Sequence, residues 1–393
     1  MEDNKNNISD KNINTDKYEK TQNNTNQDSQ TKENNTLNSQ QQDNNTQDKP
    51  HKRRVRYKGT HPRTFAEKYK EHNPEKYKDT VEKVISKGST PAGMHISIMV
   101  QEILDFLEIK PGQKGIDATL GYGGHTSKML EKLEGKGHVY GLDIDPIEIE
   151  KTKKRLKDKG FGEDIFTGVN INFKYIDKVA EKYGPFDFVL ADLGVSSMQI
   201  DNPERGFTYK YEGPLDLRLN PNQGISAAER INSISLDELE GMLIENSDEP
   251  YAYEIAKTVV EERRKNKIET TTQLKDIVEK ALVYLPKKEK EEAVKKSCAR
   301  TFQALRIDVN NEFEVLYEFL EKLPNILTPN GRVAILTFHS GEDRLVKKSF
   351  KTLKKQGIYS DVARDVIRPG KAECNRNPRA KSTKMRWAIK NNL

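Results

Sequence analysis

The chain has 393 residues, of which 34% are hydrophobic and 33% are charged, and its formal net charge is +6 at pH 7. No stretch of the sequence is apolar for long enough to cross a membrane, so we expect no membrane partner. Two cysteines in so long a chain form neither a disulfide framework nor a zinc cluster, and we expect free thiols in a reducing cytoplasm.

The first 93 residues differ in composition from the rest. In residues 1–50 roughly two-fifths of the side chains are Asn or Gln, and a tract so poor in apolar residues predicts a disordered tail. It resembles neither a secretory signal nor a mitochondrial transit peptide. Residues 51–93 form a basic extension with interleaved aromatic residues. Either this extension contacts RNA or it is a solvated Lys-rich segment, and the sequence leaves both possibilities open.

An ordered α/β pattern begins near residue 94, with a helix expected over 99–107. A short buried strand over 114–119 then leads into a glycine-rich turn at Gly121, Gly123 and Gly124, followed by an amphipathic segment. A second apolar strand ends at Asp143, about twenty residues beyond the turn. This layout is typical of a nucleotide-binding unit, in which the glycines let the backbone approach a ligand and the acid accepts ribose hydroxyls.

The spacing of the glycines indicates which kind of nucleotide ligand the turn binds. A dinucleotide site needs G-x-G-x-x-G, whereas this turn has G-x-G-G-H, with Asp117 four residues before the first glycine. That pattern suits a ligand without phosphate, such as S-adenosylmethionine, and therefore favours a methyltransferase. The alternative is that the turn serves only the tight connection that any open α/β sheet requires.

Further elements follow in order. We expect a helix over about 146–157, a third strand over 169–176 and a fourth over 186–192, but the next comparable strand, 331–338, comes about 140 residues later. The helical region between them predicts an inserted domain over 197–305, between methyltransferase parts at 94–196 and 306–393. An insertion at the ligand edge of the sheet suits substrate recognition, although a stabilising or oligomerising appendage remains an alternative.

The segment from Asp192 to Gln199 carries the second chemical signal. An exocyclic base amine is a poor nucleophile, and an acceptor in its plane holds its N–H groups and frees the nitrogen lone pair. Asp192 is the candidate catalytic residue for this positioning. The alternative is that it only binds the cofactor.

Together these motifs resemble the bacterial 16S ribosomal RNA cytosine-N4 methyltransferases, a family of class I methyltransferases, over residues 94–393. The resemblance implies a Rossmann-like α/β sheet with an inserted, mostly helical substrate-recognition domain. It also implies S-adenosylmethionine as methyl donor and N4 of a cytidine in the decoding region of the small ribosomal subunit as acceptor. The motifs that carry it are His95-x-x-Ile98, Asp117-x-Thr-x-Gly-x-Gly-Gly-His125, Asp143-Ile-Asp145-Pro146, Asp192-Leu-Gly-Val-Ser-Ser197, Glu204-Arg-Gly-Phe207, Gly213-Pro-Leu-Asp-Leu-Arg218, Ala299-Arg-Thr-Phe-Gln-Ala-Leu-Arg306, Phe338-His-Ser340, Glu342-Asp-Arg344 and Asn377-Pro-Arg-Ala-Lys-Ser382.

The family pattern also assigns site residues. One departure from it is Gly341, which stands where the family usually has Leu and is expected to loosen the start of the helix that follows. The family's cofactor positions fall on Gly123, Gly124, His125, Asp143, Phe173, Asp192 and Gln199. The candidate substrate-binding residues are Arg205, Phe207, Arg218 and His339.

Each candidate substrate residue also has a structural interpretation. The arginines could instead pin the insertion to the sheet through ion pairs such as Asp216 with Arg218 or Asp343 with Arg344. His339 could be a satisfied buried histidine. No His, Cys and carboxylate spacing in the sequence suggests a metal.

The sequence therefore predicts a cytoplasmic ribosomal RNA cytosine-N4 methyltransferase that acts by direct in-line transfer. Two alternatives remain: an enzyme of the same fold acting on DNA, protein or a small amine, and a non-catalytic assembly factor that binds rRNA. The oligomeric state, monomer or homodimer, is left open.

Overall fold

The structure is a computed structural model that describes residues 97–196, 199–200 and 202–392. These residues belong to a single compact unit. The tail 1–50, the basic extension 51–93, His95 and Ser197 lie outside the described residues.

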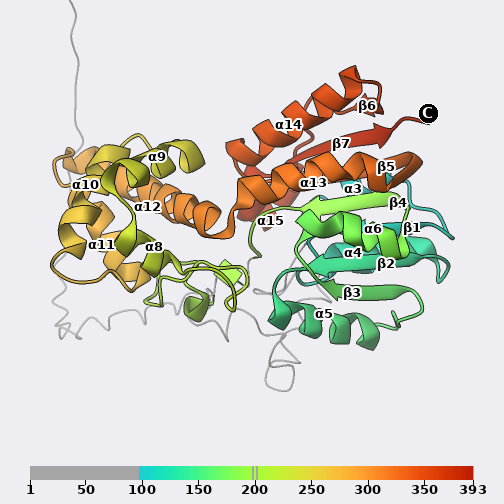
Figure 1. Ribbon diagram of the computed structural model, residues 1–393, viewed down its shortest axis with the longest axis horizontal. Helices are drawn as coiled ribbons and strands as arrows, with labels where there is room; N and C mark the ends of the chain where they lie inside the picture. The colour runs from blue at the N-terminus through green and yellow to red at the C-terminus, as the bar shows by residue number, and fades with distance from the viewer. Residues whose placement is uncertain (1–96, 197–198, 201, 393) are drawn as a thin grey trace, which may run out of the picture. The chain divides into compact units, whose positions relative to one another are not determined.

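Helices and strands alternate at both ends of this unit, and helices dominate its middle (Figure 1). In chain order the elements are α3 (Val100–Leu107), β1 (Lys114–Asp117), α4 (Gly124–Leu133), β2 (His138–Asp143), α5 (Pro146–Asp158), β3 (Phe166–Asn170), η2 (Phe173–Tyr175), α6 (Ile176–Tyr183), β4 (Phe186–Asp192), η3 (Pro203–Arg205), α8 (Ala227–Ser233), α9 (Leu236–Ser247), α10 (Ala252–Arg263), α11 (Thr271–Ala281), α12 (Lys287–Asn310), α13 (Glu312–Ile326), β5 (Leu327–Thr337), α14 (Ser340–Lys355), β6 (Tyr359–Val362), α15 (Lys371–Arg376), η4 (Pro378–Ser382) and β7 (Lys384–Lys390).

The strands form one sheet in the order β3-β2-β1-β4-β5-β7-β6. Strands β1 to β5 pair in parallel, whereas β7 runs antiparallel to both of its neighbours, β5 and β6. A mostly parallel sheet with one reversed strand next to its edge confirms the predicted class I methyltransferase architecture.

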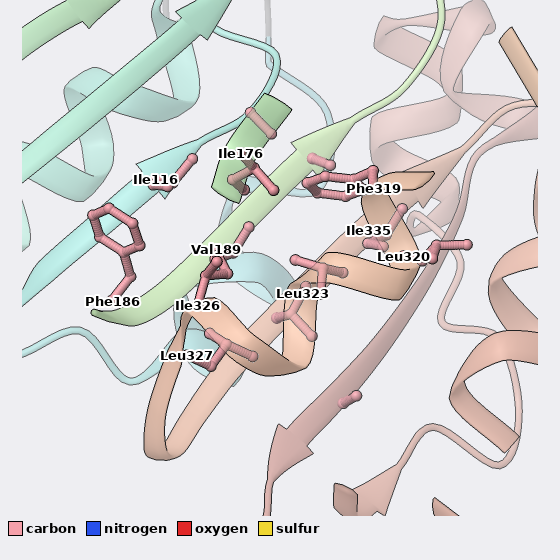
Figure 2. Close-up of a cluster of buried hydrophobic side chains, with 14 of the residues drawn as sticks. Ile116, Ile176, Phe186, Val189, Phe319, Leu320, Leu323, Ile326, Leu327 and Ile335 are labelled. Atoms are coloured by element: carbon pink, nitrogen blue, oxygen red, sulfur yellow. The ribbon is translucent and has the colours of Figure 1, made fainter. Parts of the chain in front are cut away.

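Alternating side chains of the strands bury both faces of the sheet. In β4, Val189 packs on one face and Phe188 on the other. Helices α6, α13 and α14 cover the first face, and α3, α4 and α5 cover the second. Figure 2 shows Phe319 and Leu323 of α13 beside Val189 and Ile335 in the first of these layers. Because both faces are covered, only the strand ends are left to bind ligands.

The region between β4 and β5 has its own hydrophobic core, built from α8 to α12 and the loop before them. Helix starts within it are fixed by side-chain caps at Ser226, Ser235 and Thr270, each of which accepts from a backbone N–H. The region is helical, as predicted. The boundary at residue 305 remains a proposal, and α12 runs through it without interruption to Asn310.

The third strand was predicted wrongly. It covers Phe166–Asn170 instead of 169–176, and a 3₁₀ turn and α6 occupy the rest. Val169, Ile171 and Phe173 alternate as in a strand, but the Asn172 side chain accepts from the Lys174 N–H and turns the chain. Smaller shifts affect β1, which ends at Asp117, and β5, which begins at Leu327.

Within the described residues no helix is long and apolar enough to cross a membrane.

The close approach of β1 and β4 yields a stability prediction. A Cβ at Gly115 would lie 1.9 Å from Cε2 of the buried Phe188 ring, so Gly115→Ala should lower the free energy of unfolding by about 3 kcal/mol. Gly241→Ala in α9 is the control, because nothing lies within 4 Å of its Cβ position and alanine favours a helix by about 1 kcal/mol. Urea titration of both variants measures the difference, and equal midpoints would contradict the packing.

Candidate functional site

Five parallel strands end at one edge of the sheet, and each ends in a polar residue. These residues are Asp117 of β1, Asp143 of β2, Asn170 of β3, Asp192 of β4 and Thr337 of β5. A cavity of about 520 Å³ lies over this edge, and Asp143 and Asp192 line it. Ligands in open α/β sheets bind at this edge, so the cavity is the candidate active site.

The glycine turn after β1 forms one wall of the cavity. Gly121 and Gly123 both have positive φ, at 46° and 77°. A Cβ at Gly123 would lie 2.7 Å from Cγ2 of Thr152 in α5, and the Thr152 hydroxyl donates to the Gly121 carbonyl. Only glycine allows the turn to pack this closely on α5 while its other side faces the cavity.

Asp143 is held by two backbone donors. Its Oδ2 accepts from the Gly121 N–H and its Oδ1 from the Asp145 N–H, each at 2.8 Å. Burial nevertheless raises the pKa of Asp143 to about 7. The carboxyl group is therefore fixed in place and titrates near neutral pH.

Asp145 joins the inserted region to the sheet. One carboxylate oxygen caps α5 by accepting from the Ile147 and Glu148 N–H groups. The other accepts from the Arg205 guanidinium at 2.7 Å and from the Gln199 amide at 3.3 Å. Because the Asp145 side chain is only 1% exposed, this is a buried ion pair.

Asp192 has one held oxygen and one free oxygen. His125 Nε2 lies 2.9 Å from the Ile98 carbonyl, and Nδ1 of the same ring lies 3.6 Å from Asp192 Oδ2. Asp192 Oδ1 is buried and has no hydrogen-bond partner. Burial raises the pKa of Asp192 to about 6, with His125 opposing that shift. An unpartnered buried acceptor beside a cavity is costly and indicates a ligand donor.

His339 follows β5 at the neighbouring strand end. Its Nε2 lies 3.2 Å from Oε1 of the buried Glu342, whose Oε2 accepts from the Phe338 N–H. No hydrogen bond of the described residues satisfies either ring nitrogen of His339, Nδ1 or Nε2. Burial raises the pKa of Glu342, but His339 and other partners outweigh it and hold the pKa below its usual range. The pair is a carboxylate beside an imidazole, and Nδ1 of that imidazole is the nitrogen that does not face Glu342.

Glu312 lies beside this pair, and ligand atoms of Glu312, His339 and Glu342 are within 4.8 Å of one another. Both Glu312 oxygens already accept from Arg306, at 2.7 and 2.9 Å. The sequence spacing did not reveal this cluster.

The structure places most of the predicted site residues around one cavity. Arg205 and Arg218 do not line it: Arg205 binds Asp145, and Arg218 pairs with Asp216 at 2.7 Å. Their roles in substrate binding remain predictions. The predicted residues that line the cavity are Gly123, Gly124, His125, Asp143, Phe173, Asp192, Gln199, Phe207 and His339.

One predicted ion pair is wrong. Asp343 binds Arg386 at 2.7 Å and Lys384 at 3.2 Å, whereas Arg344 lies 3.8 Å from Asp248. Adjacent residues on a helix point in different directions, so Asp343 and Arg344 do not face each other.

Two functional features were missed from the sequence. Asp145 was quoted only as part of a motif, and Glu342 had no assigned role, although His339-x-x-Glu342 has the i, i+3 spacing of a facing pair at a helix start. The segment after β6 was quoted as the family motif Asn377-Pro-Arg-Ala-Lys-Ser382, and Asn377, Arg379 and Ser382 of that motif line the cavity.

Comparisons with known proteins identify the family of the chain. The model of the MraW methylase family matches residues 92–391. The chain belongs to the MraW methylase family. That match includes every strand of the sheet and the whole inserted region.

Individual members of the family are closely similar over most of the chain. "Ribosomal RNA small subunit methyltransferase H 1" of Lachnoclostridium phytofermentans is 70% identical over 88% of this chain and 94% of its own length. The protein of the same name from Agathobacter rectalis is 68% identical over 88% of this chain and 99% of its own. "Ribosomal RNA small subunit methyltransferase H 2" of Alkaliphilus metalliredigens is 62% identical, covering 86% and 97%.

The pKa of Asp143 leads to a prediction for donor binding. Since that pKa is about 7, the group gains a proton as the pH falls below neutrality, and a protonated carboxyl accepts ribose hydroxyls weakly. The affinity for S-adenosylmethionine should therefore decrease with falling pH, approaching about tenfold per unit for one titrating group. Calorimetry from pH 5.5 to 8.5 measures this slope. Asp143→Asn, as control, should bind weakly at every pH, and an equal slope in both proteins would contradict the assignment.

The Arg205 contact leads to a second prediction. Arg205→Ala leaves a buried Asp145 oxygen without its cation, which should lower the free energy of unfolding by about 3 kcal/mol. Arg218→Ala is the control, because both partners of that pair are partly exposed and its loss should cost about 1 kcal/mol or less. If Arg205 serves only to bind substrate, urea unfolding of Arg205→Ala will match that of the unmodified protein.

Proposed function

We propose that this protein transfers a methyl group from S-adenosylmethionine to N4 of a cytidine in 16S ribosomal RNA of the small subunit. The observation that carries the proposal is the free, buried Oδ1 of Asp192, a residue that lines the same cavity as the glycine turn. The printed names of the close relatives support the acceptor.

The residues around the cavity fit this donor. Bound S-adenosylmethionine supplies an electrophilic methyl group on a positively charged sulfur. The turn at Gly121 and Gly123 presents close backbone, and Asp143 accepts from the ribose hydroxyls. Phe173, whose ring packs edge-on against Phe319, provides an apolar wall at the same cavity. The carboxylates of Asp143 and Asp192 also favour a cationic ligand.

Asp192 supplies what the acceptor amine needs. Its Oδ1 accepts one N4–H group, which holds the amine and favours a pyramidal nitrogen with a free lone pair. The new N–C bond forms as the C–S bond breaks and its electron pair passes to sulfur. N4 then carries one proton too many, and Asp192, with a pKa of about 6, is a suitable acceptor for that proton.

His339 is suited to the second hydrogen of the same amine. Strands β4 and β5 are neighbours, with Asp192 paired to Leu336, so Asp192 and His339 stand on adjacent strand ends. Glu342 lies next to Nε2 of His339, which leaves Nδ1 to accept. Two unpartnered acceptors on one cavity match the two N–H groups of an unmethylated amine.

The two cysteines lie away from this chemistry. Methylation at C5 of cytosine needs a thiolate nucleophile. Cys298 is buried in the core of the inserted region, where desolvation raises its pKa to about 12, and Cys374 lies in α15. Neither lines the cavity, which supports direct transfer to N4 without a covalent adduct.

The inserted region supplies the opposite wall, which suits a large substrate. Phe207, Tyr209 and Phe302 line the cavity from that side, and the Tyr209 and Phe302 rings are 5.3 Å apart. Aromatic side chains of this kind stack on a base that has been turned out of its helix. We therefore assign substrate recognition to residues 197–305, and a ribosomal acceptor places the reaction in the cytoplasm.

Methylation of small subunits from cells that lack this enzyme tests the proposal. With labelled donor, followed by digestion to nucleosides, the label should appear in N4-methylcytidine. Label at C5, in DNA or protein, or in no product would contradict it.

Asp192→Asn in the same assay tests the role of the acid. Turnover should fall about 10²-fold or more, because the amide can neither accept the proton nor offer a charged acceptor. Donor affinity measured by calorimetry should change by no more than a few fold. Asp143→Asn is the matched control with the opposite pattern, and equal losses of donor affinity in both variants would leave Asp192 as a cofactor ligand only.

A further inference from the structure

The connection between β6 and β7, residues 363–383, crosses the ligand edge of the sheet. Because β7 is antiparallel to β5, its first residue, Lys384, pairs with Thr337 at the end of β5. The residues that precede Lys384 therefore lie beside the strand ends that carry the proposed chemistry. Asn377, Arg379 and Ser382 of this connection line the cavity itself.

This connection is strongly basic. It contains six Arg and Lys residues and two acids, whereas the whole chain of 393 residues has a net charge of only +6. One of the two acids, Glu373, is engaged, since its Oε1 accepts from the Met99 N–H at 2.8 Å. Among the described residues, none forms an ion pair or a side-chain hydrogen bond with any of five exposed cations, Arg364, Arg368, Lys371, Arg376 and Lys381.

The fold holds these cations on a fixed support. Ile367 and Met385 exchange two backbone hydrogen bonds, at 3.1 and 2.9 Å. Ala380 is fully buried in the core layer beneath α3 and α4. A cationic surface that is already ordered loses little conformational entropy when it binds a polyanion.

We infer that residues 363–383 form a platform that binds the phosphates of the RNA strand on one side of the target cytidine. This inference rests on the proposed function, and it adds the path by which the strand reaches the cavity. When the target base enters the cavity, the RNA backbone on either side of it stays at the entrance. The platform provides unpaired Arg and Lys side chains there. Guanidinium and ammonium groups without protein partners suit phosphate oxygens, and their contacts fix the register of the strand without reading its sequence.

A charge-removal experiment tests the platform. The triple variant Arg368→Gln, Arg376→Gln, Lys381→Gln removes three exposed cations that do not line the cavity. The matched control is Lys154→Gln, Lys157→Gln, Lys159→Gln at the end of α5, which removes the same charge. Those lysines are also exposed and unpaired among the described residues. Helix α5 starts at the ligand edge, so its last turn is directed to the opposite edge of the sheet.

Filter binding of protein-free 16S rRNA, with S-adenosylhomocysteine present, is measured from 50 to 300 mM salt. The platform variant should lose about tenfold or more in affinity at 150 mM salt. The slope of log affinity against log salt should become shallower by about two, since three phosphate contacts each contribute about 0.7 on a single strand. The control should keep the slope of the unmodified protein, and both variants should bind the donor normally.

Equal slopes and affinities in the two variants would overturn the platform, whether both bind as the unmodified protein does or both bind more weakly. If the platform instead bound an acidic protein, the two variants would also show equal slopes and affinities for RNA, and the inference would be overturned. Failure of the proposed function is a separate outcome, because it appears as absence of N4-methylcytidine in the methylation assay, whereas the salt slope is measured without any methyl transfer.

Discussion

The buried ion pair between Asp145 and Arg205 is the contact on which the cleft depends. Asp145 follows β2, caps α5 with one oxygen, and receives the inserted region through the other. The Asp145 N–H donates a hydrogen bond to the carboxylate of Asp143, the proposed ribose acceptor. The position of Asp143 therefore depends on the same turn. A single carboxylate thus sets the start of a helix, the orientation of a binding residue and the docking of the substrate-recognition region. The side-chain amide of Gln199, in the segment that follows Asp192, donates to the same oxygen of Asp145. Asp145 therefore contacts the segments that follow both β2 and β4.

The acids of the cavity and the unpaired cations near it lie in different places. Acids such as Asp143, Asp192 and Glu342 line the cavity, where a sulfonium donor adds positive charge. The unpaired cations lie outside it, on the connection between β6 and β7, which is the proposed phosphate platform. Burial raises the pKa of both Asp143 and Asp192, and a cationic ligand favours their charged forms. The interior is therefore suited to the donor and the rim to the polyanionic acceptor, and each would repel the other's ligand.

Local patterns in the sequence identified much of this arrangement. The glycine turn and the apolar strands that end at Asp143 and Asp192 are short-range signals, and the structure has the turn and both strands where they were predicted. The error at 169–176 arose because a capped turn at Asn172 interrupts a run that alternates like a strand.

Long-range contacts were not predictable in this way. Asp145 and Arg205 are separated by 60 residues, and the true partner of Asp343 is Arg386 on a later strand. Pairing of that kind depends on the order of strands in the sheet, which a single sequence does not specify.

The substitution of Gly341 for the family's leucine shows a related effect. A Cβ there would lie 2.6 Å from the Phe313 ring, so a residue on another helix occupies the space of the missing side chain.

Helix α12 has a consequence for how such an enzyme can be divided. Its 24 residues span about 36 Å; the helix packs in the core of the inserted region through Cys298 and Leu305 and ends at the cavity, where Arg306 meets Glu312 of the next helix. No loop separates the recognition region from the catalytic sheet on this side. The inserted region therefore cannot be exchanged by recombination at a flexible linker on this side. An exchange that changed the acceptor would have to replace all of α12, together with the core that it packs against and the part of the cavity wall that it forms.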